Sequence, residues 1–164
     1  MQTPRWLVRF DNASLEFARK NSAGLLRITL GVVFLWFGAL KIFGVSPAAE
    51  LVAKTLFFLP AHVAVMGMGI VELLIGVGLL TGFAMRVTLL LFFAQMAGTF
   101  LTMIVRPDLT FVDGNLLKLT TNGEFIIKNL VLMSAGLAIL ATVRRARVAS
   151  NIPDVLAEKA NSAR

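Results

Sequence analysis

The stretch Met68-Gly-Ile-Val-Glu-Leu-Leu-Ile-Gly-Val-Gly78 places a carboxyl group in the middle of an apolar run. With its flanks the run is long enough to cross a bilayer. A charged side chain at the centre of a membrane helix costs about 2.5–3.5 kcal/mol on insertion scales, so such residues are rare and usually have a partner or a task. Glu72 is therefore the residue that the rest of the chain must accommodate, and we expect the other apolar stretches to surround it.

The composition indicates an integral membrane protein. The 164 residues are 57% hydrophobic and only 15% charged, and the mean hydropathy is +0.82. A soluble domain of this length could not bury so much apolar surface. The sequence has no cysteine and a single histidine, which argues against thiolate-bound clusters, haem and histidine-rich metal sites. We therefore expect no metal site and no encoded cofactor.

Hydropathy predicts an all-α fold, a four-helix antiparallel bundle in the membrane. The expected spans are residues 24–43, 62–82, 86–105 and 124–143. A basic amphipathic segment, residues 1–22, precedes the bundle, and a basic tail, residues 144–164, follows it. Ser46-Pro47 is a typical helix start and predicts a short helix on the membrane surface within residues 44–61. Turn residues dominate positions 106–123, where we expect a loop that caps the bundle.

The distribution of basic residues predicts how the bundle is oriented. If the N-terminus lies inside, the inside ends hold Arg5, Arg9, Arg19, Lys20, Arg86, Arg144, Arg145 and Arg147. The outside connections then hold only Lys54, Arg106 and Lys118. The excess of Lys and Arg on the cytoplasmic side of membrane proteins therefore predicts that both termini are cytoplasmic.

Two cations of the first span lie on the same helical face as two glycines. Arg27, Gly31, Phe34, Gly38 and Lys41 follow the spacing of one face of a helix. Small residues let helix backbones approach closely, so this face is expected to pack on another helix and to turn both cations inwards. The alternative is that both cations extend to the lipid headgroups.

The acid of the second span also lies between glycines. Gly69, Glu72 and Gly76 share a face, which predicts a groove that receives another helix. Gln95 lies near the middle of the third span, and we expect the polar residues of the spans to converge on one side, in a cavity that opens outward.

The fourth span carries a further cation, Lys128. Glu124 and Lys128 are correctly spaced for a local ion pair. Lys128 nevertheless lies about one turn below the start of the span, and it is on a different helix from Glu72. We therefore prefer Lys128 as the partner of Glu72 and keep Lys41 as the second choice.

Three segments together resemble a known family. They are Leu26-Arg-Ile-Thr-Leu-Gly-Val-Val-Phe-Leu-Trp-Phe-Gly-Ala-Leu-Lys-Ile-Phe43, Gly69-Ile-Val-Glu72 and Gly123-Glu-Phe-Ile-Ile-Lys-Asn-Leu130. In order and spacing they are similar to the DoxX-like superfamily, and closest to its YkgB/RclC branch, over roughly residues 25–143. In that branch the lysine of the fourth span is usually followed by Asp, where this sequence has Asn129.

The resemblance implies a four-helix protein of the bacterial inner membrane. One branch of the superfamily is a subunit of a thiosulfate:quinone oxidoreductase, and other branches are linked to oxidative or chlorine stress. The positions of this sequence that match recurrent family positions are Arg27, Trp36, Lys41, Glu72 and Lys128.

Three functions remain open at this point, and whether the protein is an enzyme is left open with them. The first is a redox-associated subunit that binds a quinone or a similar lipophilic molecule. The glycine-lined faces and Trp36 would form the slot, Gln95 with Lys41 or Lys128 would donate hydrogen bonds, and Glu72 would move a proton. The full set of candidate ligand-binding residues is Glu72, Lys128, Lys41, Gln95, Trp36 and Arg27.

A partner would have to supply the electrons, since the chain encodes no redox centre. The expected partners are membrane lipid, a redox subunit or a second copy of the chain, and not nucleic acid. The second function is a proton-coupled carrier that uses Glu72, although the chain shows no inverted repeat. The third is a structural or assembly protein in which a buried pair only sets helix register.

Overall fold

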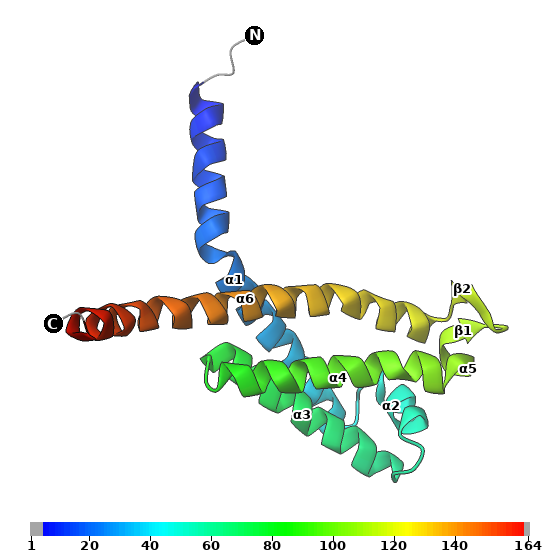
Figure 1. Cartoon of the computed structure of the whole chain (residues 1–164). Helices are drawn as coiled ribbons and strands as arrows, with labels where there is room; N and C mark the ends of the chain where they lie inside the picture. Colours follow the sequence, from blue (N-terminus) through cyan, green and yellow to red (C-terminus); the bar gives the residue numbers. More distant parts are fainter. Residues whose placement is uncertain (1–4, 163–164) are drawn as a thin grey trace.

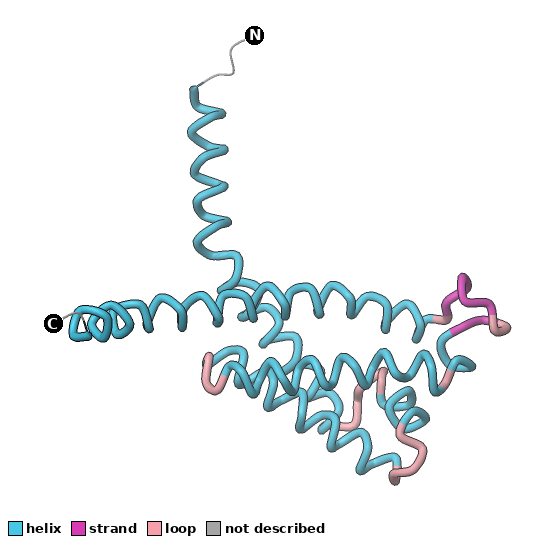
Figure 2. The backbone as a smooth tube through the Cα atoms, viewed as in Figure 1, coloured by secondary structure: helices cyan, strands magenta, loops and turns pink. Residues whose placement is uncertain are grey.

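Four long helices carry most of the chain (Figures 1 and 2). The computed structural model describes the backbone of residues 5–162 and the side chains of residues 10–143. The elements follow in the order α1 (Arg5–Ile42), α2 (Ala49–Thr55), α3 (Ala61–Thr81), α4 (Met85–Val105), α5 (Pro107–Thr110), β1 (Phe111–Val112), β2 (Asn115–Leu119) and α6 (Thr121–Ser162).

The predicted fold class is confirmed. Four helical segments are long and apolar enough to cross a membrane, and they are Phe10–Ile42, Ala61–Thr81, Met85–Val105 and Thr121–Val143. The first helix is longer than the predicted first span, because α1 continues without a break into the expected N-terminal amphipathic segment. Figure 1 shows this early part of α1 projecting away from the other helices.

The interior of the bundle is largely apolar. Its buried core cluster consists of Leu30, Phe34, Ile75, Leu79, Leu89, Phe92, Met96 and Ile139. The rings of Phe34 on α1 and Phe92 on α4 lie 5.3 Å apart, centre to centre. Many large apolar side chains face outwards, among them Val63, Leu90 and Ile104. Such a surface would be a liability in water, and it fits a protein whose solvent is the bilayer.

Glycines bring α1 and α3 into backbone contact. A methyl group added at Gly38 would lie 2.8 Å from the carbonyl oxygen of Gly69, and one added at Gly76 would lie 2.7 Å from the backbone nitrogen of Leu35. The predicted glycine faces of the first and second spans therefore pack on each other. This crossing places the last turns of α1 against the middle of α3, where Glu72 lies.

The α1–α3 and α4–α6 connections lie at the end of the bundle opposite the α3–α4 turn. The first was predicted correctly and the second was not. The expected short helix within residues 44–61 is α2. The expected loop over residues 106–123 is instead a short helix, α5, followed by a β-hairpin. Asp113 and Gly114 have φ angles of 51° and 71°, as a two-residue hairpin turn requires. The turn signal was visible in the sequence, but strands this short have too little alternation to be recognised.

The prediction that both termini are cytoplasmic depends partly on residues whose side chains lie outside the described range. These are Arg5 and Arg9 near the N-terminus, and Arg144, Arg145 and Arg147 in the basic tail. The backbone of α6 continues through that tail to Ser162.

Candidate functional site

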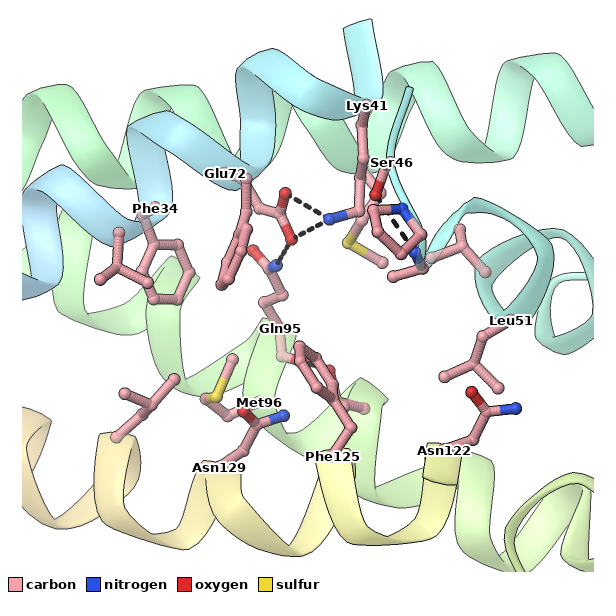
Figure 3. A pocket seen from close by; sticks show the side chains of 18 of the residues that line it. Phe34, Lys41, Ser46, Leu51, Glu72, Gln95, Met96, Asn122, Phe125 and Asn129 are labelled. Carbon is pink, nitrogen blue, oxygen red and sulfur yellow. Dashed lines mark hydrogen bonds and ion pairs between the residues drawn. The ribbon is translucent and has the colours of Figure 1, made fainter. Parts of the chain in front are cut away.

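A buried ion pair joins α1 to α3. The Lys41 Nζ atom donates hydrogen bonds to both carboxylate oxygens of Glu72, at 2.8 Å to Oε1 and 2.7 Å to Oε2 (Figure 3). The two residues are only 7% and 8% exposed. The glycine crossing produces this contact, because it brings the two backbones close enough for a lysine side chain to span the remaining distance.

The prediction that Lys128 is the partner of Glu72 is wrong. Lys128 instead pairs with Glu124 on its own helix at 3.4 Å, and its side chain is 75% exposed. The next residue, Asn129, lies about 100° further round the helix and is the one that faces the interior, with 8% exposure. The prediction failed because the rotation of α6 turns Lys128 outwards and Asn129 inwards.

Gln95 on α4 completes the polar cluster. Its Nε2 atom donates a hydrogen bond of 2.9 Å to Glu72 Oε1. The opposite amide orientation would place two oxygen atoms against each other, so the carboxylate determines which end of the amide faces it. The Gln95 Oε1 atom is buried and has no hydrogen-bond partner among the described residues. Three helices therefore meet at one carboxylate, and one buried acceptor is left over.

A cavity of about 290 Å³ lies beside this cluster (Figure 3). Lys41, Glu72 and Gln95 form a polar part of its wall. Much of the remaining wall is apolar, with aromatic, thioether and aliphatic side chains from α1, α3, α4 and α6, namely Val33, Phe34, Phe37, Met68, Met96, Phe125 and Leu132. The volume is close to the lower end of the range for small-molecule pockets. An apolar chamber with a few convergent polar groups is the usual form of a ligand site.

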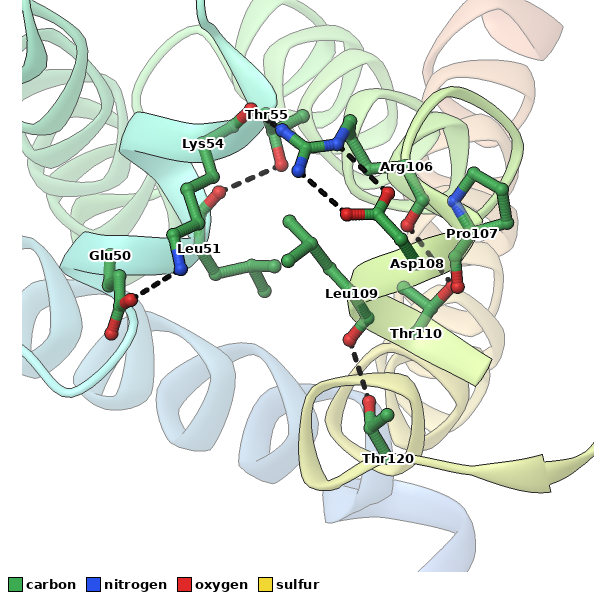
Figure 4. Close-up of polar contacts among 10 residues, drawn as sticks. All are labelled: Glu50, Leu51, Lys54, Thr55, Arg106, Pro107, Asp108, Leu109, Thr110 and Thr120. Atoms are coloured by element: carbon green, nitrogen blue, oxygen red, sulfur yellow. Dashed lines mark hydrogen bonds and ion pairs between the residues drawn. The ribbon is translucent and has the colours of Figure 1, made fainter. Parts of the chain in front are cut away.

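The segment around α2 covers the cavity. Ser46, Pro47, Ala48, Leu51 and Val52 contribute to its wall. A clamp of three residues holds α2 to the end of α4 (Figure 4). In this clamp the Arg106 Nη1 atom donates a 2.7 Å hydrogen bond to the carbonyl oxygen of Lys54. Two further hydrogen bonds, of 3.0 and 2.7 Å, run from Arg106 to the Asp108 carboxylate.

The clamp is also an electrostatic unit. The hydrogen bonds from Arg106 lower the pKa of the Asp108 carboxyl below its ordinary value. Asp108 in turn raises the pKa of Arg106. Both shifts favour the charged forms, so at neutral pH the Arg106–Asp108 ion pair is formed and orients the guanidinium that donates to the Lys54 carbonyl oxygen of α2.

Two other candidate residues lie away from the cavity. Trp36 is 66% exposed and is not among the residues that line it, so the expected contribution of Trp36 to the slot is not seen. The Arg27 guanidinium lies beside Gly82 at the other end of α3. Fourteen residues of helix separate Arg27 from Lys41, which corresponds to about 21 Å. Of the six candidates, Lys41, Glu72 and Gln95 meet at the cavity, and Arg27, Trp36 and Lys128 do not.

Phe37, Phe125 and Asn129 are among the cavity residues that the sequence analysis did not single out. Phe37 and Phe125 approach each other with a ring separation of 6.4 Å and form part of the wall between α1 and α6. Nothing distinguishes these two from the other phenylalanines of the spans. Asn129 carried a usable signal, since an amide within a span normally faces the protein interior. Among the described residues no group of His, Asp and Glu side chains is arranged to hold a metal ion.

The fold and the site define a multi-pass membrane protein whose helices enclose an ion pair and a small cavity. The DoxX family model matches residues 23–104, which is half of the chain, and the protein belongs to the DoxX family. The matched region contains Lys41, Glu72 and Gln95, but not the α6 wall of the cavity. Comparison with curated proteins and with solved structures found no match.

Proposed function

We propose that the protein binds a neutral, lipid-soluble molecule of the quinone class in the cavity beside Lys41, Glu72 and Gln95. The observation that carries this proposal is the mixed character of the cavity wall. Lys41, Glu72 and Gln95 converge at one carboxylate, aromatic and aliphatic side chains occupy much of the rest, and polar side chains of α6 line a further part, namely Thr121, Asn122 and Asn129. A ring with oxygen substituents offers both polar and apolar surface to such a wall.

Charge balance supports a neutral ligand. The positive charge of Lys41 lies directly against the negative charge of Glu72, so the polar wall has no net charge. An anionic ligand would gain little from a lysine that is already paired, and it would face the carboxylate. A neutral ring avoids that repulsion and can use the aromatic surfaces of Phe34, Phe37 and Phe125.

We further propose that this binding serves a redox system in the bacterial inner membrane, with both termini cytoplasmic. Glu72 would pass a proton to or from the ligand, since a carboxylate within hydrogen-bond reach of a ring oxygen can act as acid or base. Electrons would come from a partner subunit. The likeness of the three sequence segments to the YkgB/RclC branch supports this context.

A structural role is the second candidate, and the glycine crossing favours it. The ion pair connects α1 and α3 at the place where their backbones touch, so it could act by fixing the register of these two helices. A purely structural pair does not need a cavity beside it. Ligand binding therefore separates the two candidates.

The test is equilibrium binding of a short-chain benzoquinone analogue to the protein in lipid nanodiscs. Three proteins are compared, namely the wild type, Thr99→Phe, which fills the cavity from α4, and Trp36→Leu, which alters an exposed position. We expect saturable binding of one molecule per chain, weakened at least about tenfold by Thr99→Phe and unchanged by Trp36→Leu. Equal, non-saturable uptake by all three proteins would contradict the proposal. Thermal unfolding of each protein verifies that the variants are folded.

A further inference from the structure

The first part of α1 stands apart from the bundle. Every residue from Phe10 to Lys20 is exposed, so this part of the helix packs on none of the other helices. Figure 1 shows it running across the direction of α4 and α6 and not along it. We call residues 10–22 the arm.

The length of α1 indicates where the arm lies. The apolar part of the helix, Phe10–Ile42, has 33 residues. At 1.5 Å per residue it is about 50 Å long, whereas about 20 residues cross a hydrocarbon core of about 30 Å. The predicted span at residues 24–43 uses that length, so the arm begins where the first span reaches the membrane surface. A segment that runs across the direction of the spans at this point lies along the surface.

The junction between the arm and the span can bend. Ser22 and Gly24 lie there, and sharp changes of helix direction commonly occur at Gly and Ser. A methyl group added at Gly24 would have no neighbouring atom within 4 Å. Close helix packing therefore does not explain this glycine, in contrast to Gly38 and Gly76.

The arm has an apolar face and a polar face. Helical spacing places Phe10, Ala13 and Phe17 on one face. The two phenylalanines are 72% and 62% exposed. Polar side chains occupy the opposite face, namely Asn12, Glu16 and Arg19, and Asp11 and Leu15 lie between the two faces.

We infer that the arm is an interfacial helix, which lies flat in the leaflet nearest the N-terminus and turns Phe10, Ala13 and Phe17 towards the acyl chains. Its partner is the bilayer surface. Helices with aromatic residues on one face and charges on the other bury the apolar face about 5–10 Å into the boundary between headgroups and acyl chains. Residues 5–22 carry four basic and two acidic side chains, so anionic headgroups attract the segment. Such an anchor fixes the tilt and rotation of the following span, which carries Lys41.

The experiment places one nitroxide spin label at a time on the full-length protein in nanodiscs that contain phosphatidylglycerol. The chain has no cysteine, so a label attaches only where a cysteine is introduced. Phe10→Cys, Ala13→Cys and Phe17→Cys label the apolar face. The polar face is labelled by three further variants, namely Asn12→Cys, Glu16→Cys and Arg19→Cys. Collision rates with oxygen, which concentrates in the membrane, and with a water-soluble nickel chelate measure the depth of each label.

We expect the ratio of oxygen to nickel collisions to be at least about fivefold higher on the apolar face than on the polar face. Leu90→Cys, at a position of α4 that is 69% exposed, and Asp113→Cys, at the hairpin turn, give the reference values for lipid and for water. A depth that increases steadily from residue 10 to residue 19 would overturn the inference, because the arm would then continue the span.

Two other results would also overturn it. Equal access of nickel to all six labels would show that the arm extends into water. Protection of the apolar face from both reagents would show that protein covers it, as a second copy of the chain could.

A paired substitution tests whether the phenylalanines hold the arm in the membrane. With the label at Ala13→Cys, the pair Phe10→Ser and Phe17→Ser should lower the collision ratio to that of the water reference. The matched control, Asn12→Ser with Glu16→Ser, should leave the ratio unchanged. A label that stays in lipid after both phenylalanines are lost from a folded protein would contradict the assignment of this face.

Discussion

Glu72 is the central residue of the buried polar cluster. Its carboxylate accepts hydrogen bonds from Lys41 and Gln95, and all three side chains belong to different helices. The cost of placing an acid at this depth is offset only while these partners are present. Removing one member of a buried pair leaves a charge without compensation, whereas removing both replaces the pair by apolar packing.

Single and double substitutions of Lys41 and Glu72 should therefore change the free energy of unfolding by different amounts. Glu72→Leu or Lys41→Met alone is expected to destabilise the folded protein by about 3–5 kcal/mol, and the double variant by much less than the sum. Free energies of unfolding in detergent measure the effect. The matched control is Lys128→Met, which removes the exposed pair with Glu124 and should change stability by less than about 0.5 kcal/mol. Additive losses at Lys41 and Glu72 would show that the two do not act as a pair.

At the scale of elements, glycines determine where the two helices of the ion pair touch. Gly38 lies against the backbone of α3, where the atoms closest to an added methyl group are the Gly69 carbonyl oxygen and the Leu73 nitrogen. Gly67, on α3 itself, has no neighbouring atom within 4 Å of such a methyl group. Substitution by alanine therefore tests the close helix contact at Gly38, whereas at Gly67 it tests only helix propensity.

Gly38→Ala is expected to push α1 away from α3 and to destabilise the protein by about 1–3 kcal/mol. Gly67→Ala should be neutral or stabilising by up to about 1 kcal/mol, because alanine is the better helix former. Thermal or denaturant unfolding of both variants checks the difference. Equal effects of the two changes would contradict the close crossing.

The clamp on α2 predicts that the effect of Asp108 on amide hydrogen exchange in α2 depends on pH. The pKa of Asp108 in the folded protein lies below its ordinary value of 3.8, so its contribution is present above that pH and is lost as the pH falls through the lowered value. At pH 7, Asp108→Asn should speed amide hydrogen exchange in α2, residues 49–55. The difference from the wild type should shrink as the pH falls through the lowered pKa of Asp108, where the wild-type carboxyl becomes protonated.

The control for the clamp is Asp113→Asn at the hairpin turn, which should leave exchange in α2 unchanged. Exchange in α2 that is the same in the wild type and in Asp108→Asn at pH 7 would show that the clamp does not hold the cover of the cavity.

At the scale of the whole molecule, the basic residues predict which end of the bundle faces the cytoplasm. The cavity cover and the hairpin then face the outside, and both termini face the inside. Reporter fusions should place the C-terminus in the cytoplasm and an insertion at Asp113-Gly114 outside it. A reporter that is active on the opposite side at either position would reverse the orientation and the direction in which the cavity opens.

The four spans and the facing glycines could be predicted because hydropathy and helical spacing are local properties of the chain. The partner of Glu72 could not, because the choice between Lys41 and Lys128 depends on how α6 is rotated relative to α3. The same rotation brings Asn129 inwards, which the position of Lys128 alone does not reveal. The cavity depends on α2 and on the Phe37 and Phe125 rings, and no single segment encodes their arrangement.

The account depends on a molecule that occupies the chamber beside the ion pair. The most direct measurement is mass spectrometry of the compounds that copurify with the protein from native membranes, quantified per chain for the wild type, Thr99→Phe and Trp36→Leu. The account predicts one neutral aromatic compound with a ring oxygen per wild-type chain, lost in Thr99→Phe and retained in Trp36→Leu. The same amount in folded Thr99→Phe as in the wild type, or no such compound in the wild type, would contradict it.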